Sequence, residues 1–166
     1  MKAFRYHRPT SPADASSSDK DGATVLKAGG IDLLDRMKER VDQPDRVVGL
    51  LDLPGEGMRG IAVRGDEGLR IGALVTLAQL AGGARVRKWN AALADAAGSA
   101  ASPQIRNRAT LGGNLAQHTR CGYYRHRSFP CLKRGGASCP VLVEGAVQDT
   151  AAIFANRPCA SAHPSS

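Results

Sequence analysis

Cysteine is absent from the first 120 residues of this 166-residue chain, and aromatic residues make up only 4% of it. No window approaches the run of about 20 apolar residues that a membrane-spanning helix needs. The N-terminal stretch MKAFRYHRPT has positive charge but no apolar run behind it, so we expect no export signal of the chain's own. The length and the 42% hydrophobic content predict one α/β-type domain or two small subdomains that share a core.

Acidic residues are absent between residues 96 and 143, so this stretch carries +7 of the formal net charge of +8. Its bases are Arg106, Arg108, Arg120, Arg125, Arg127, Lys133 and Arg134. The remainder is nearly balanced, with 16 Lys or Arg residues against 15 Asp or Glu residues. A basic block of this kind indicates a nucleic acid, an acidic partner or a bound anion, and composition alone does not choose among them.

The four cysteines all lie in the last third of the chain, at Cys121, Cys131, Cys139 and Cys159. In a chain without a secretion signal, such a group favours metal ligation over disulfides. The spacing C-x9-C-x7-C-x19-C differs from the close C-x2-C pairs of zinc ribbons and common ferredoxins. Spacing alone therefore leaves an iron–sulfur cluster, a zinc ion and free or disulfide-bonded thiols open.

Local patterns predict strands and helices that alternate along the chain. We expect a loop or weak helix over 10–22, a strand ending at Gly29-Gly30, a helix over 31–41 and a strand over 45–53. Two strands should flank the turn Asp66-Glu67-Gly68, and helices should begin near Thr76 and cover 86–101.

Two glycine pairs could let a ligand approach the backbone. Gly29-Gly30 lies between a predicted strand and a predicted helix, where free N–H groups can bind a phosphate. Gly112-Gly113 repeats this arrangement after RNRATL. Taken singly, each pair is more often a turn than a phosphate site. Neither fits the GxGxxG pattern, which argues against a standard dinucleotide-binding fold.

Taken together and in order, these stretches resemble a known family. The matching segments are KAGGIDLLDRMKER, LRIGALVTLAQLA, ALADAAGSAASPQIRNRATLGGNLAQHTRCGYYRHRSFPCLKRGG and NRPCASAHPS. They are similar to the flavin subunit of molybdenum-containing hydroxylases, the xanthine dehydrogenase family, and most of all to the FAD and iron–sulfur subunit of periplasmic-type aldehyde oxidoreductases. The resemblance runs from Met1 to Ser165 and corresponds to the N-terminal half of that subunit.

The resemblance implies an α/β (α+β) fold of two small FAD-binding subdomains, over 1–55 and 56–166, with an iron–sulfur loop over 118–160. Ile31 stands where the family usually has threonine. Because family members are about twice as long, the second subdomain would be incomplete, and we expect the chain alone to hold FAD weakly. The FAD-binding residues that the resemblance implies are Leu26, Lys27, Ala28, Gly29, Gly30, Ile31, Asp32, Leu33, Ser102, Thr110, Gly112, Gly113 and Asn114. For Ser102, a polar helix end is an equal alternative.

In the aldehyde-oxidoreductase branch, the resemblance implies that Cys121, Cys131, Cys139 and Cys159 bind a [4Fe–4S] cluster. Such a cluster is negatively charged, so neighbouring basic residues would offset its charge and raise its potential. We expect His118, His126 and His163 to be polar surface residues rather than ligands. No nucleophile–base pair is visible, so we expect no residue of this chain to act on substrate.

The implied function is electron transfer within a heterotrimer. A molybdenum-cofactor large subunit and a [2Fe–2S] small subunit would deliver electrons to FAD in this chain, which passes them to an external acceptor. We expect no nucleic acid and no membrane partner, and either a cytoplasmic location or export bound to a signal-bearing partner. The alternative is a zinc-stabilised nucleic-acid-binding module built on the basic aromatic stretch YYRHRSF.

Overall fold

The computed structural model describes residues 1–17, 23–55, 57–65, 68–147, 149, 151–152, 154 and 158–162. The chain forms two compact units whose segments alternate along the sequence. Unit 1 comprises residues 1–2, 32–43 and 116–166, and unit 2 comprises residues 3–31 and 44–115. Helices and strands are mixed, which confirms the predicted fold class. The predicted division into FAD-binding subdomains at residue 55 stays a prediction.

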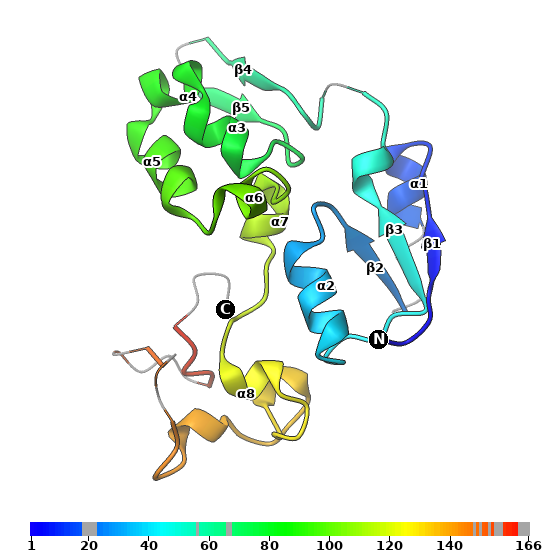
Figure 1. Cartoon of the computed structure of the whole chain (residues 1–166), viewed down its shortest axis with the longest axis vertical. Helices are drawn as coiled ribbons and strands as arrows, with labels where there is room; N and C mark the ends of the chain where they lie inside the picture. The colour runs from blue at the N-terminus through cyan, green and yellow to red at the C-terminus, as the bar shows by residue number, and fades with distance from the viewer. Residues whose placement is uncertain are drawn as a thin grey trace. The chain divides into compact units, whose positions relative to one another are not determined.

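A three-stranded parallel sheet forms one part of unit 2 (Figure 1). The central strand β3 (Arg46–Gly49) pairs with β1 (Arg5–His7) on one side and β2 (Thr24–Lys27) on the other. Val48 of β3 is fully buried and packs with Ala15 of helix α1 (Pro12–Ser17). The predicted strand over 45–53 is too long, because its last residues form the 3-10 turn η1 (Leu50–Asp52).

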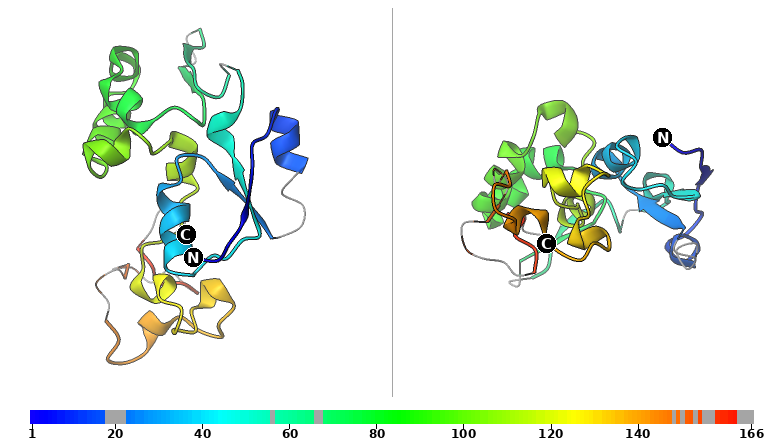
Figure 2. Two further views of the ribbon diagram at one scale, coloured as in Figure 1. Left: turned by 45° about the vertical axis from the view of Figure 1, so that its right-hand side comes forward. Right: turned by 90° about the horizontal axis from the view of Figure 1, so that it is seen from below.

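The predicted hairpin is confirmed in the other part of unit 2. Strands β4 (Ile61–Val63) and β5 (Leu69–Ile71) are antiparallel, whereas Asp66 and Glu67 of the predicted turn lie outside the described residues. Helices α3 (Leu77–Gly82), α4 (Ala84–Trp89) and α5 (Ala91–Ser99) gather beside the hairpin (Figures 1 and 2). Their shared core consists of Val75, Leu77, Leu80, Val86, Ala94 and Ala97.

Asn90 interrupts the single helix that was predicted over 86–101. Its backbone is non-helical, with φ −154° and ψ 88°, and its side chain accepts a hydrogen bond of 2.9 Å from the N–H of Leu93. Asparagine favours this N-cap position because its side-chain oxygen satisfies a free N–H of the first helical turn. Two short helices, α4 and α5, therefore replace one long helix.

The described residues of unit 1 form little regular structure. It contains nearly all of α2 (Ile31–Lys38), together with α8 (Gly122–Arg125) and the 3-10 turns η2 (Leu132–Arg134) and η3 (Pro140–Leu142). Two short helices close unit 2, α6 (Pro103–Arg106) and α7 (Leu111–Leu115). No helix within the described ranges has the length and apolar character to cross a membrane.

Replacing Leu80 by alanine should test the core of unit 2, where this side chain is fully buried. Loss of a buried leucine side chain costs about 2–5 kcal/mol. We expect Leu80→Ala to lower the free energy of unfolding by this amount in urea titrations followed by the fluorescence of Trp89, the only tryptophan. Leu115→Ala, where the side chain is 66% exposed, is the matched control and should change it by less than about 0.5 kcal/mol. Equal effects of the two substitutions would contradict this core assignment.

Candidate functional site

The two glycine-containing loops meet within unit 2. A Cβ atom at the buried Gly29 would overlap the carbonyl oxygen of Arg108, so only glycine allows this approach of backbone to backbone. A Cβ at Gly113 would lie 3.0 Å from Thr110 Oγ1 and 3.9 Å from the Cβ of Ala28. The structure therefore brings the first loop, Ala28–Gly30, against the second loop, residues 108–114.

The two loops differ in their free hydrogen-bond donors. The N–H groups of Gly29 and Gly30 donate no hydrogen bond to any other described residue. Gly30 has a φ of +83°, a conformation that favours glycine. The N–H groups of residues 111–114 all donate within the protein, to the carbonyls of Val75, Ala73 and Thr110 and to the Thr110 hydroxyl. Free donors for an anion are therefore found in the first loop.

Two of the predicted polar side chains form local caps. The oxygen of the buried Thr110 hydroxyl accepts a hydrogen bond of 3.1 Å from Gly113 N–H at the start of α7. Ser102 Oγ accepts one of 3.4 Å from Ile105 N–H and caps α6, as the helix-end interpretation expects. Roles of Thr110, Asn114 and Ser102 toward FAD stay predictions.

Two basic residues, Lys27 and Arg108, lie next to the first loop in unit 2. The Lys27 ammonium lies 5.7 Å from the centre of the Tyr6 ring. Burial, followed by the positive charge of Arg108, lowers the pKa of Lys27. Burial and the carboxylate of Asp52, which accepts a hydrogen bond of 3.0 Å from Tyr6, raise the pKa of Tyr6. A nearby anion would stabilise the protonated form of a lysine whose pKa is lowered in this way.

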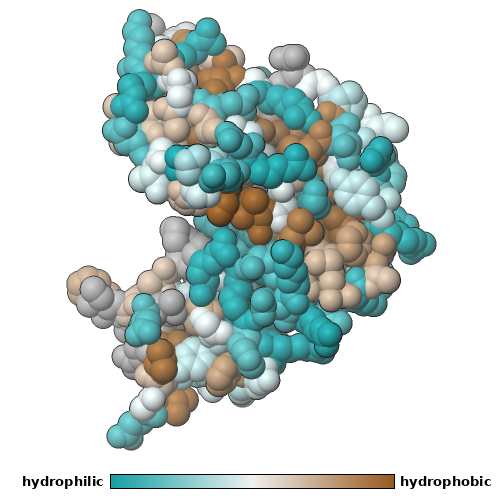
Figure 3. All heavy atoms as spheres, in the orientation of Figure 1, coloured by the Kyte–Doolittle hydropathy of each residue, from teal (hydrophilic) through white to brown (hydrophobic). Residues whose placement is uncertain are grey.

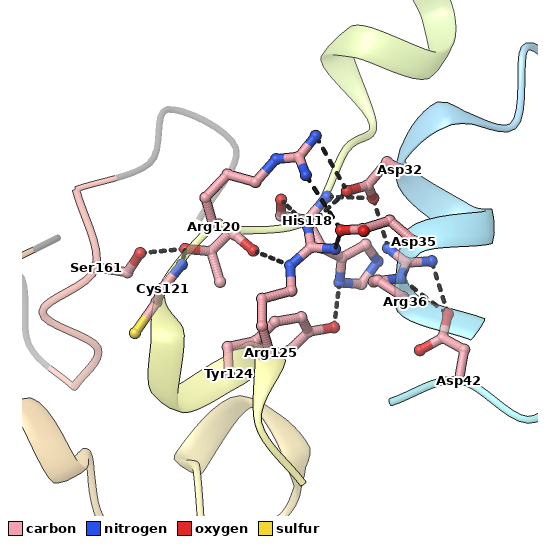
Figure 4. Close-up of polar contacts among 11 residues, drawn as sticks. Asp32, Asp35, Arg36, Asp42, His118, Arg120, Cys121, Tyr124, Arg125 and Ser161 are labelled. Carbon is pink, nitrogen blue, oxygen red and sulfur yellow. Dashed lines mark hydrogen bonds and ion pairs between the residues drawn. The ribbon is translucent and has the colours of Figure 1, made fainter. Parts of the chain in front are cut away.

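Asp32 is bound by protein donors in unit 1. Its carboxylate accepts hydrogen bonds from Arg36 at 2.9 Å, from Arg125 at 2.5 Å and from the His118 N–H at 3.0 Å (Figure 4). Burial acts to raise the pKa of Asp32, but the hydrogen bonds from Arg125 and His118 and the nearby positive charges outweigh it and lower the pKa. The side chain of Leu33 is buried. Both side chains therefore belong to the interior of unit 1, and a role of either residue toward FAD stays a prediction.

Arg125 is also bound by acceptors within unit 1. Its guanidinium donates to both Asp32 and Asp35, and to the backbone carbonyls of His118 and Thr119. Arg36 extends the network by pairing with Asp42 at 2.7 Å. On the face drawn in Figure 3, the surface over α2 is hydrophilic. The i, i+4 spacing of Asp32 and Arg36 is a sequence signal for their pairing, whereas nothing local predicts the partners of Arg125.

His118 contacts Tyr124, an aromatic residue close in sequence to the first cysteine. The Tyr124 hydroxyl and His118 Nδ1 are 2.7 Å apart, and the two rings are stacked with centres 5.7 Å apart. Partial loss of water contact, followed by the positive charge of Arg36, lowers the pKa of His118. Burial raises the pKa of Tyr124. His118 therefore supports the cysteine-rich segment, whereas His163 lies outside the described residues.

Three of the predicted cluster ligands lie together in unit 1. Cys121, Cys131 and Cys139 are buried in one group with Tyr124, Val141 and Ala160, and the half-buried Cys159 directly precedes Ala160. All four thiols are free. Within the described ranges, no group of three or more His, Cys, Asp or Glu side chains could hold a metal ion. The sequence therefore predicted the gathering of the cysteines, while ligation stays a prediction.

Hydroxyl hydrogen bonds and a backbone bridge join the cysteine-bearing segments. The Cys121 N–H donates to the Thr119 hydroxyl at 3.1 Å, and that hydroxyl contacts the Ser161 hydroxyl near Cys159. Cys131 forms an isolated β-bridge with Ser138, next to Cys139. These contacts hold segments far apart in sequence beside each other.

Comparisons with known proteins point to one family. The family described as FAD binding domain in molybdopterin dehydrogenase matches residues 2–159. The chain is 43% identical to the aldehyde oxidoreductase FAD-binding subunit PaoB of Escherichia coli K12, over 99% of this chain and 51% of that protein. It is 36% identical to the carbon monoxide dehydrogenase medium chain of Hydrogenophaga pseudoflava, over 68% of this chain and 39% of that protein.

Solved structures agree with these sequence matches. A CO dehydrogenase structure from Oligotropha carboxidovorans matches 70% of this chain and 41% of its own chain, with a TM-score of 0.65 and 33% identity. Quinoline 2-oxidoreductase from Pseudomonas putida 86 matches with a TM-score of 0.63 and 31% identity, over 70% of this chain and 41% of its own. The chain spans about half the length of the curated relative PaoB.

Protonation of Asp32 in acid should lower the free energy of unfolding. Because its pKa is lowered in the folded state, Asp32 stabilises the fold fully above its unfolded pKa of about 3.9 and less as the pH falls toward the folded value. We expect Asp32→Asn to lower the free energy of unfolding by about 3 kcal/mol at pH 7 and to flatten its decline below pH 4.

Asp95→Asn is the matched control, because Asp95 pairs with Arg87 at 2.8 Å but is 66% exposed. Its removal should cost less than about 1 kcal/mol. Urea titrations from pH 2.5 to pH 7 give the free energy of unfolding at pH 7 and its decline in acid. The same acid dependence in the two variants would show that Asp32 is not the group responsible.

Proposed function

Because the chain belongs to the family of FAD-binding domains of molybdopterin dehydrogenases, we propose that it is the electron-transfer subunit of a molybdenum-dependent oxidoreductase. The observation that carries the proposal is the meeting of Ala28–Gly30 with residues 108–114, where the N–H groups of Gly29 and Gly30 donate to no other described residue. The similarity to a subunit named for aldehyde oxidoreductase supports aldehydes as the substrate class of the whole complex.

The residues present fit FAD. Gly29 and Gly30 would donate backbone N–H groups to its pyrophosphate, and the first turn of α2 would add donors without intrahelical partners. Lys27 would supply positive charge beside the same loop. Ile31 in place of threonine removes a hydroxyl but leaves these backbone donors intact. The bound flavin supplies the redox chemistry, and the protein supplies its position and electrostatic environment.

We also propose that the four cysteines bind a [4Fe–4S] cluster. Their free, largely buried thiols and their packing in one group with Tyr124 and Val141 support this assignment. In such a cluster each thiolate binds a different iron atom, so the four sulfurs need not converge on one point. Zinc requires four ligands around one ion, and the described residues show no such convergence.

The basic residues favour this proposal over a nucleic-acid-binding module. Such a module needs its guanidinium groups on an exposed groove, but Arg125 is bound to two carboxylates and two carbonyls within unit 1. Arg120 also faces Asp35, at 3.3 Å. As in the family it resembles, the chain would work beside a molybdenum subunit and a [2Fe–2S] subunit.

Gly113→Ala should weaken FAD binding, because its added methyl group would crowd Thr110 where the two loops meet. The added methyl group would meet only Thr110 Oγ1 and Ala28 Cβ within 4 Å, so it would fill the space between the two loops. Gly82→Ala is the matched control, because Gly82 is also helical and has nothing within 4 Å of its Cβ position. Titration followed by flavin fluorescence should show about a tenfold higher Kd for Gly113→Ala alone, equivalent to about 1.4 kcal/mol. Unchanged FAD affinity would remove these loops from the site.

Cys131→Ser should remove most of the iron from anaerobically prepared protein and leave its flavin content unchanged. Serine lacks the thiolate that an iron–sulfur cluster requires. Ser138→Ala is the control within the same segment, because Ser138 faces Cys131 across the β-bridge but has no thiol. Iron and sulfide analysis beside flavin extraction separates the two cofactors. Full iron content in Cys131→Ser, or none in the unchanged chain, would contradict the cluster assignment.

A further inference from the structure

Arg134 donates hydrogen bonds to the loop between Cys121 and Cys131. Its guanidinium NH2 group donates to the carbonyls of Tyr123, His126 and Phe129 at 3.2, 2.9 and 2.6 Å, and its NH1 group lies 3.5 Å from the Arg127 carbonyl. Its backbone N–H donates to the Cys131 carbonyl at 2.9 Å. The side chain is therefore fixed by its two terminal nitrogens inside the cysteine-rich segment.

The third guanidinium nitrogen of Arg134 has no acceptor. Its Nε atom is buried and makes no hydrogen bond with any described residue. A buried N–H without an acceptor is rare and points to a partner such as an ion or water. The cost of leaving a charged donor unsatisfied exceeds that for a neutral one.

We propose that Arg134 donates its Nε–H to a sulfur atom of the [4Fe–4S] cluster, an inference that rests on the cluster assignment above. Thiolate and sulfide sulfurs are the acceptors that a cluster adds to this segment. A hydrogen bond of this kind stabilises the reduced, more negative cluster more than the oxidised one, and so raises the reduction potential. Arg134 is thus a positioning and potential-setting residue.

The other bases of the segment do not offer the same donor. Arg125 and Arg120 face the carboxylates of α2. Arg127 and Lys133 are exposed. Arg134 alone among the described bases of residues 120–134 has a buried N–H without an acceptor.

The test uses the full chain with its cluster reduced by dithionite and its arginines labelled with nitrogen-15. Pulsed EPR should detect a nitrogen-15 coupling to the cluster. Arg134→Lys keeps the positive charge but removes Nε–H, so the coupling should vanish and the reduction equilibrium constant should fall by about tenfold, which is about 59 mV for a one-electron couple. Arg127→Lys is the matched control and should keep both the coupling and the potential.

A cluster signal without any nitrogen-15 coupling would overturn the inference and leave the cluster assignment intact. Absence of iron and of the EPR signal from the unchanged chain would overturn both. If Arg134→Lys does not bind a cluster, the nitrogen-15 coupling is measured in Arg120→Lys, Arg125→Lys and Arg127→Lys instead. A coupling that survives in all three supports Arg134, and its loss in any one of them assigns the donor elsewhere.

Discussion

The carboxylate of Asp32 is the contact on which the organisation of unit 1 depends. It accepts N–H groups from α2 itself, from the backbone at His118 and from Arg125 in α8. Arg125 in turn binds the carbonyl of Thr119, whose hydroxyl receives the N–H of Cys121 and contacts Ser161. Because Asp32 is only 13% exposed, its charge is stable there only while these donors are all in place. An ion network rather than a large apolar core thus fixes the cysteine-bearing segments.

Local sequence patterns predicted the parts of the fold that depend on neighbouring residues. The glycine pair after β2, the hairpin strands β4 and β5, and the start of α3 at Thr76 all follow from turn and cap residues close in sequence. The short strand β1 was not predicted, since its three residues have no alternating pattern and its pairing partner Val47 is remote in sequence. The break at Asn90 was also missed, because the alanine content on both sides favours one helix.

The candidate site was predictable in its residues but not in their contacts. A family resemblance located both glycine loops and all four cysteines, and the structure brings the loops together and gathers the cysteines. It could not show that the second loop uses its N–H groups internally, because their acceptors at Ala73 and Val75 lie more than 30 residues earlier. The resemblance also could not show that Arg125 binds the carboxylates of α2, because these lie 90 residues or more earlier in the sequence.

The alternation of the two units along the sequence has a consequence for how the chain folds. Residues 44–115, which complete unit 2, are synthesised between the two main segments of unit 1. Arg125 is synthesised 93 residues after Asp32. At ~5–20 residues per second on the ribosome, this delay is roughly 5 to 20 seconds. During that interval Asp32 lacks both the His118 N–H and the Arg125 guanidinium as donors, and unit 2 can form first. The closing of so long a loop makes unit 1 the slower part of the molecule to fold.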